Sequence, residues 1–165
     1  MTTLKKLLLI WIAVIVLILI AARFIVTDSK RVNRVLQATE AAIRSADADG
    51  LVAHVASDYE YQGLTREALQ QHARAIFRRG QFPTTIMRNK SIQVAEGVGN
   101  VKFTVFAQPA QGSPYPPSNT AWRLKLQKRD GRWWITEIEL LTVDGHAMGD
   151  LKQVMELAEG MGGGK

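Results

Sequence analysis

Residues 120–143, TAWRLKLQKRDGRWWITEIELLTV, carry the clearest structural signal in this chain. Apolar and polar residues alternate on both sides of Asp130-Gly131, and such alternation is typical of half-buried strands joined by a tight turn. The apolar positions keep one phase up to Ile135 and take the opposite phase from Ile138 onward. Because a change of phase inside a strand needs an extra residue, the pattern predicts a β-bulge between these two positions.

The rest of the chain divides at Pro83 into helical spacing before it and alternation after it. Alternation predicts strands over residues 85–95, 100–108, 120–127 and 132–143, with a tight connection at 96–100 and a Pro/Gly-rich loop at 109–118. Helical spacing predicts helices over residues 28–46, 51–56 and 66–79, and a short one over 151–160. The expected caps are Thr27 or Asp28, Thr65, Gly80 and Asp150.

Helices followed by long antiparallel strands make an α+β order, and several short motifs in it resemble the NTF2-like superfamily, which includes SnoaL-like and ketosteroid-isomerase-like proteins. These motifs are DADGL at 47–51, SDY at 57–59, GLTREAL at 63–69 and DGRWWI at 130–135. The resemblance covers residues 28–143. It implies a cystatin-like cone, in which three helices pack on a curved, mostly antiparallel sheet, with a short C-terminal helix after it.

Residues 7–26, LLLIWIAVIVLILIAARFIV, form an apolar run interrupted only by Arg23. As a helix this run is about 30 Å long, which matches the hydrocarbon core of a bilayer. A cleaved export signal ends in a small-x-small pattern, whereas Leu19 and Ile20 stand two residues before Ala21 and Ala22. The run therefore predicts an uncleaved signal-anchor, a transmembrane helix that crosses the lipid bilayer once.

The predicted divisions are a short tail at 1–6, the transmembrane helix at 7–26, the NTF2-like domain at 27–145, and a short helix with a disordered Gly-rich tail at 146–165. Basic residues flank both ends of the apolar run, so the charge rule leaves its orientation open. A short tail before a long apolar run resembles a Sec signal-anchor, and long domains cross largely regardless of charge. We therefore expect a bacterial inner-membrane protein with an extracytoplasmic C-terminal domain.

Candidate catalytic residues follow from the resemblance, because isomerases of this superfamily use a carboxylate base and hydroxyl or acid donors around a buried oxyanion. The nearest candidates are Asp58, Tyr59, Tyr61 and Glu137. Three of them have a structural alternative. Asp58 and Tyr59 fit a capped turn with a core tyrosine, and Glu137 fits a solvent-facing position after the bulge. The sequence therefore leaves an enzyme uncertain.

Other chemistry has little support in the sequence. The chain has no cysteine, and His54, His72 and His146 lack the spacing of metal ligands. Gly97-Val98-Gly99 joins two predicted strands and does not open a helix, so it does not fit a phosphate loop. We predict no metal and no cofactor. The chain has 21 basic and 15 acidic residues, and three of the basic ones flank the apolar run, so no nucleic-acid partner is expected.

The leading hypothesis is a membrane-anchored domain with a non-catalytic binding or assembly role. One alternative is a SnoaL-like or ketosteroid-isomerase-like enzyme, or a pocket for a small hydrophobic ligand. A second alternative is an inner-membrane component of a secretion-type complex, since type IV secretion assembly factors similarly join one membrane helix to such a domain. Adjacent Trp133 and Trp134 should face opposite sides of the strand, which makes the outer sheet face a candidate surface for a homodimer or a protein partner.

Overall fold

The computed structural model describes the backbone of residues 3–161 and the side chains of residues 12–16 and 28–156. The helices are α1 (Thr3–Arg44), α2 (Ala48–Val52), α3 (Arg66–Arg79) and α4 (Leu151–Met161). A small hairpin consists of β1 (Glu60–Tyr61) and β2 (Leu64–Thr65). The main strands are β3 (Thr84–Ala95), β4 (Val98–Gln108), β5 (Ser118–Arg129), β6 (Arg132–Val143) and β7 (His146–Ala147).

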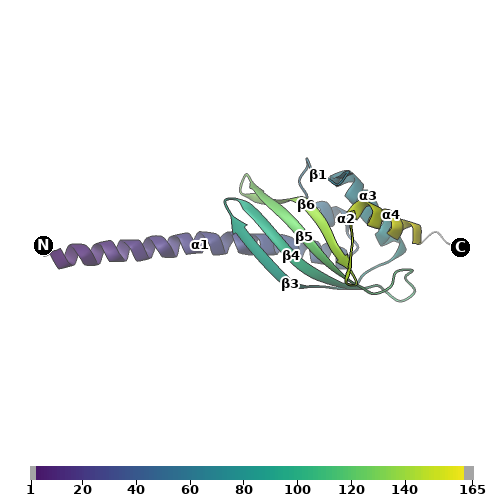
Figure 1. Ribbon diagram of the computed structural model, residues 1–165, viewed down its shortest axis with the longest axis horizontal. Coiled ribbons are helices and arrows are strands. Elements are labelled where there is room, and N and C mark those ends of the chain that lie inside the picture. Colours follow the sequence, from purple (N-terminus) through teal and green to yellow (C-terminus); the bar gives the residue numbers. More distant parts are fainter. Residues whose placement is uncertain (1–2, 162–165) are drawn as a thin grey trace.

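The main strands form one antiparallel sheet in the order β3-β4-β5-β6-β7. Figure 1 shows the sheet curving over the C-terminal half of α1, with α2, α3 and α4 gathered near one end. The N-terminal half of α1 projects beyond the sheet with no other element beside it. The predicted α+β architecture with a curved antiparallel sheet is therefore confirmed.

The predicted bulge in β6 is confirmed, and it falls on Thr136. Lys125 of β5 faces Glu137, whereas the next residue, Leu126, faces Ile135, so Thr136 is the extra residue of β6. Its hydroxyl donates to the Lys125 carbonyl at 3.2 Å. A second shift leaves one residue of β6 unpaired near its end, and a third interrupts β3. Bulges bend and twist the strands that carry them, which accounts for the curvature.

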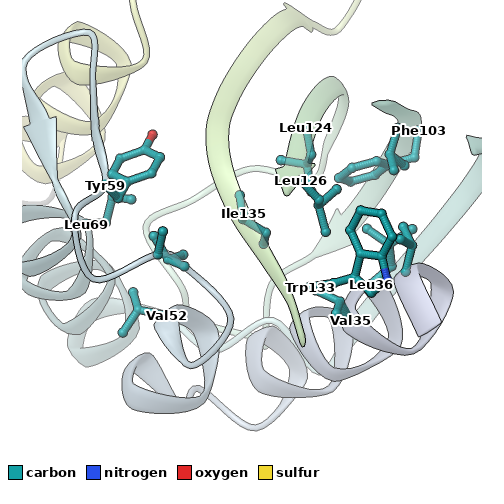
Figure 2. Close-up of a cluster of buried hydrophobic side chains, with 14 of the residues drawn as sticks. Val35, Leu36, Val52, Tyr59, Leu69, Phe103, Leu124, Leu126, Trp133 and Ile135 are labelled. Atoms are coloured by element: carbon teal, nitrogen blue, oxygen red, sulfur yellow. The ribbon is translucent and has the colours of Figure 1, made fainter. Parts of the chain in front are cut away.

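The core lies between the concave face of the sheet and the helices. Val32, Val35 and Leu36 of α1 are 5% exposed or less, as the helical spacing predicted. Figure 2 shows Val35 and Leu36 beside Trp133 of β6, with Leu126, Leu124 and Phe103 close by. Tyr59 and Leu69 lie at the other end of this cluster. The inside of the cone is thus occupied by the chain's own apolar side chains.

The helices α1 and α2 have boundaries that differ from the predicted ones. No break separates the apolar run from the first predicted helix, because α1 is continuous through Thr27 and Asp28. Asp28 therefore does not cap a helix, and its carboxylate instead accepts from Lys128 Nζ at 3.0 Å. The predicted helix at 51–56 is wrong by several residues, since α2 begins at Ala48 and is capped by Asp47. The hairpin strand β7 was not predicted at all.

Thr65 and Gly80 bound α3 as expected. The Thr65 hydroxyl accepts from the Ala68 N–H at 3.2 Å. Gly80 has an extended φ of −156°, so it is not there for a left-handed conformation. A Cβ at this position would lie 2.6 Å from Ser113 Oγ and 2.7 Å from Tyr115 Cδ2. Gly80 is required because the loop after β4 packs directly on its backbone.

The predicted anchor, residues 7–26, falls mostly outside the residues whose side chains are described. Within the described part of the chain, no helix combines the length and the apolar character needed to cross a membrane. The portion of α1 that is described, residues 12–16, exposes large apolar side chains. Ile12, Val14, Ile15 and Val16 are between 44% and 51% exposed. The end of the predicted Gly-rich tail, residues 162–165, lies outside the described residues.

Candidate functional site

Asp58 lies on the surface in an ion pair. Its carboxylate accepts from Arg129 Nη1 at 2.7 Å, and its side chain is 64% exposed. The hydrogen bond from Arg129 holds the pKa of Asp58 below its ordinary value. A carboxylate that is exposed, paired and held ionised makes a poor general base, because a good one has a pKa near the working pH.

Tyr59 belongs to the core. The residue is 4% exposed, and its hydroxyl has no hydrogen-bond partner among the described residues. Burial raises the pKa of Tyr59, and the nearby ionisable groups of Tyr61 and Glu137 raise it further. After burial, the backbone of Ile138 has the largest influence and lowers this pKa, although its geometry is not that of a hydrogen bond. The hydroxyl is therefore protonated and remains an unused donor.

Glu137 is held by Lys125, the residue opposite it on β5, at 2.7 Å. Its neighbour Glu139 is held in the same way by Arg123 at 2.6 Å. Leu124 and Leu126, which alternate with these basic residues, are buried, so the ion pairs lie on the outer face of the sheet. The structure thus brings Tyr61 and Glu137 each within electrostatic range of Tyr59. It does not turn a free carboxylate toward the tyrosines.

A pocket of about 370 Å³ lies elsewhere, where α1, the loop after α2 and the start of β6 meet. Its polar side chains are Arg31, His54 and Arg132, and its walls are completed by Val35, Ala53, Gly131, Trp133 and Trp134. Figure 2 places Trp133 at the opposite end of the core cluster from Tyr59, so this pocket is separate from the predicted candidates.

Backbone hydrogen bonds position the residues of this pocket. The Ile135 N–H donates to the His54 carbonyl at 2.8 Å, and the Ala56 N–H donates to the Ile135 carbonyl at 3.0 Å. These bonds fix the loop after α2 along β6 and hold His54 beside the pocket. From the other side, Arg31 Nη1 donates to the Gly131 carbonyl at 3.5 Å, a long bond that joins α1 to the β5–β6 turn.

The pocket is electropositive. Neither Arg31 nor Arg132 has a carboxylate partner within the described part of the chain. Burial lowers the pKa of His54, and the charge of Arg132 lowers it further. The Trp133 indole N–H is buried and without a partner among the described residues. Two guanidiniums without carboxylate partners, beside aromatic walls, suit an anion with an organic part.

Sequence reasoning did not find this pocket. Arg132, Trp133 and Trp134 stand in the DGRWWI motif, which predicts a strand and indicates no pocket. His54 lies nearly eighty residues earlier and Arg31 on another helix, so no spacing relates them. No group of three His, Cys, Asp or Glu side chains in the described residues is arranged to hold a metal.

The sequence matches no family model, and it matches no curated protein. The fold, in contrast, is shared with solved structures. A protein of unknown function from Mycobacterium tuberculosis is 18% identical, covering 82% of this chain and 94% of its own, with a TM-score of 0.64.

Two proteins from Novosphingobium aromaticivorans are also similar. One is an NTF2-like protein with a cystatin-like fold, 17% identical over 78% of this chain and 90% of its own, with a TM-score of 0.61. The other, named as a candidate scytalone dehydratase, is 18% identical over 76% and 92%, with a TM-score of 0.57. At these identities the likeness shows the fold alone. The predicted NTF2-like fold is thereby confirmed.

Proposed function

We propose that this chain is a single-pass protein of the bacterial inner membrane whose NTF2-like domain binds or assembles with a partner and does not catalyse a reaction. The observation that carries the proposal is that the inside of the cone is filled by apolar side chains, among them Phe103, Leu126 and Ile135. A reaction inside the cone needs a cavity lined by ionisable groups. The candidate carboxylates Asp58 and Glu137 are instead held by basic residues.

The proposed anchor is residues 7–26. Its support is the length and apolar character of the run, together with the exposure of Ile12, Val14, Ile15 and Val16 on the projecting half of α1. Exposing several large apolar side chains of a helix to water is unfavourable, because full burial stabilises each of them by about 1.5–3 kcal/mol. A lipid environment buries them all at once.

A membrane-extraction experiment tests the anchor. Two charges placed in the run, Ile15→Arg with Val16→Arg, should release the full chain from membranes washed with alkaline carbonate. Each charge at the centre of a bilayer costs about 2.5–3.5 kcal/mol on insertion scales. The matched control adds the same two charges at exposed positions of the domain, Gln37→Arg with Ala38→Arg, and should stay membrane-bound. Release of the wild-type chain by carbonate would overturn the anchor.

Orientation can be read by labelling, because the chain has no cysteine. A single cysteine in the exposed loop, Gln111→Cys, should react with a membrane-impermeant maleimide in intact spheroplasts. A cysteine before the run, Thr3→Cys, should react only after the membrane is opened. The reverse pattern would place the domain in the cytoplasm.

A second candidate function, an enzyme or a small-ligand site, is favoured by one observation. The Tyr59 hydroxyl is buried without a partner, and Tyr61 and Glu137 lie within electrostatic range. A buried donor left unpaired costs about 1–3 kcal/mol, so such groups in proteins call for an explanation. A ligand that accepts from this hydroxyl would supply one.

A further inference from the structure

We propose that the pocket between α1, the loop after α2 and the start of β6 binds a phosphate group, presented by an anionic phospholipid headgroup or by a soluble phosphate ester. This inference deepens the binding role proposed above. The choice of a lipid as the source rests on the proposed anchor, whereas the phosphate chemistry of the pocket does not.

The residues of the pocket match a phosphate in charge and in hydrogen bonding. Arg31 and Arg132 come from different elements and line the same space. Neither side chain has a carboxylate partner in the described residues. Guanidinium groups present a planar fork of N–H donors that fits two phosphate oxygens at once. His54 adds an imidazole at the same place, which donates one hydrogen bond when neutral and two when protonated.

The walls of the pocket explain why an organic phosphate fits better than a free ion. Trp133 is buried and Trp134 is half-buried, and both line the space together with Val35. At about 370 Å³ the pocket falls in the size range of small-molecule sites, about 300–1,000 Å³. A phosphate carried on a glycerol or a similar short stem would place its charge on the arginines and its carbon atoms on the indoles.

The position of the pocket along α1 favours the membrane surface as the source. Arg31 follows the end of the predicted anchor, Val26, by five residues of a continuous helix. At about 1.5 Å per residue this separation is about 8 Å. The headgroup layer extends roughly 5–8 Å beyond the hydrocarbon core on each side. With the proposed anchor in the bilayer, Arg31 would thus lie at the depth of lipid phosphates.

The fold keeps the whole pocket at that end of the domain. Lys128 pairs with Asp28, and the Gly131 carbonyl accepts from Arg31, so the β5–β6 turn is held against the start of the domain's part of α1. Arg132 follows this turn directly. Gly80 and the loop that packs on it lie at the opposite end of the sheet, where Ala107 faces Ser118.

The experiment uses the full chain in lipid nanodiscs, at constant ionic strength because exposed charges are screened by salt. In nanodiscs of phosphatidylcholine, inorganic phosphate and glycerol 3-phosphate are titrated against the His54 imidazole resonances. In a second arm, phosphatidylglycerol replaces part of the phosphatidylcholine, and the same resonances are followed. Acetate serves as the anion of different geometry.

The variants are Arg31→Gln and Arg132→Gln, and Arg79→Gln is the matched control, because Arg79 is exposed near Gly80 at the far end of the sheet. Each pocket variant should weaken binding about tenfold or more, as expected for the loss of a hydrogen bond between charged groups. The control should stay within about twofold, a change too small to reflect a lost contact. Acetate should bind more weakly than glycerol 3-phosphate.

A response to phosphatidylglycerol identifies the lipid as the source, and a response to glycerol 3-phosphate alone identifies a soluble ester. The inference is overturned if neither arm shifts the His54 resonances, or if the two pocket variants lose no more affinity than the control. Failure of the anchor would show differently, as wild-type chain that carbonate removes from membranes whatever its phosphate affinity.

Discussion

Replacing Tyr59 with phenylalanine distinguishes a structural role of this residue from a functional one. The side chain is 4% exposed, and its hydroxyl has no hydrogen-bond partner among the described residues. If the cone is a filled core, the hydroxyl has lost its contacts with water and makes no hydrogen bond in their place. Its removal should then raise the free energy of unfolding. If a ligand or a water molecule binds to the hydroxyl, removal of the hydroxyl should lower the free energy of unfolding or the activity.

The magnitude follows from the price of an unpaired buried polar group, about 1–3 kcal/mol. Tyr59→Phe keeps the ring and its packing against neighbours such as Leu69, so we expect it to raise the free energy of unfolding by about 0.5–2 kcal/mol. Tyr59→Ala is the contrasting variant. It removes the ring as well and should lower the free energy of unfolding by about 3–5 kcal/mol.

The assay is urea unfolding of the full chain in detergent micelles, followed by tryptophan fluorescence, with the two variants and wild type compared at equal slope. A loss of about 1 kcal/mol or more in Tyr59→Phe would refute the reasoning, because it would mean that the hydroxyl has a partner. That result would also favour the hypothesis of an enzyme or a small-ligand site over that of a non-catalytic domain.

The remaining predictions concern backbone packing and pH. Gly80→Ala should lower the free energy of unfolding by about 1–3 kcal/mol through overpacking, whereas Gly149→Ala, which has open space around it, should be neutral. Arg129→Gln should return the pKa of Asp58 toward its ordinary value of 3.8, as read by carboxyl NMR. Because the pKa of Asp58 is lower in the folded state than its ordinary 3.8, the Asp58 carboxylate stabilises the fold fully at pH values above 3.8. This stabilisation is lost as the pH falls through the folded-state pKa. His54 has a pKa below its ordinary 6.5, so stability should fall as pH drops below 6.5, and His54→Asn should flatten that part of the profile.

Each of these expectations has a contrary result. Equal stability of Gly80→Ala and Gly149→Ala would mean that the loop after β4 can move away from α3 at no cost. An unchanged Asp58 pKa in Arg129→Gln would place the cause of the shift in the backbone around Asp58. A stability profile that keeps its slope in His54→Asn would assign the titration to another group.

The sheet could be predicted closely because its signals are local. Alternation depends on which face of a strand is buried, and a shift in its phase marks an extra residue, so the bulge between Ile135 and Ile138 could be read directly. Thr65 is a cap because its side chain reaches an N–H only three residues away. The start of α2 was missed because Asp47 and Asp49 both have side chains that can cap a helix, and in the structure it is the Asp47 carboxylate that accepts from the N–H groups of Asp49 and Gly50.

The candidate sites could not be predicted in the same way, because their side chains come from positions far apart in the chain. Asp58 and Glu137 had free carboxylates as far as the sequence could tell, and only the register of the sheet and the position of the turn brought Arg129 and Lys125 to them. The same is true of the pocket. Its members come from α1, the loop after α2 and β6, and nothing in their spacing relates them.

The α+β order, the long strands, the bulge and the apolar run at residues 7–26 can all be predicted from the sequence, because each depends on the hydrophobicity pattern of neighbouring residues. Three features became visible only in the folded chain: the apolar filling of the cone, the pairing of the candidate carboxylates, and the pocket that Arg31, His54 and Arg132 share. Those outcomes depend on which residues meet across the fold. Side-chain pairing and burial are properties of the packed chain, and no local pattern encodes them.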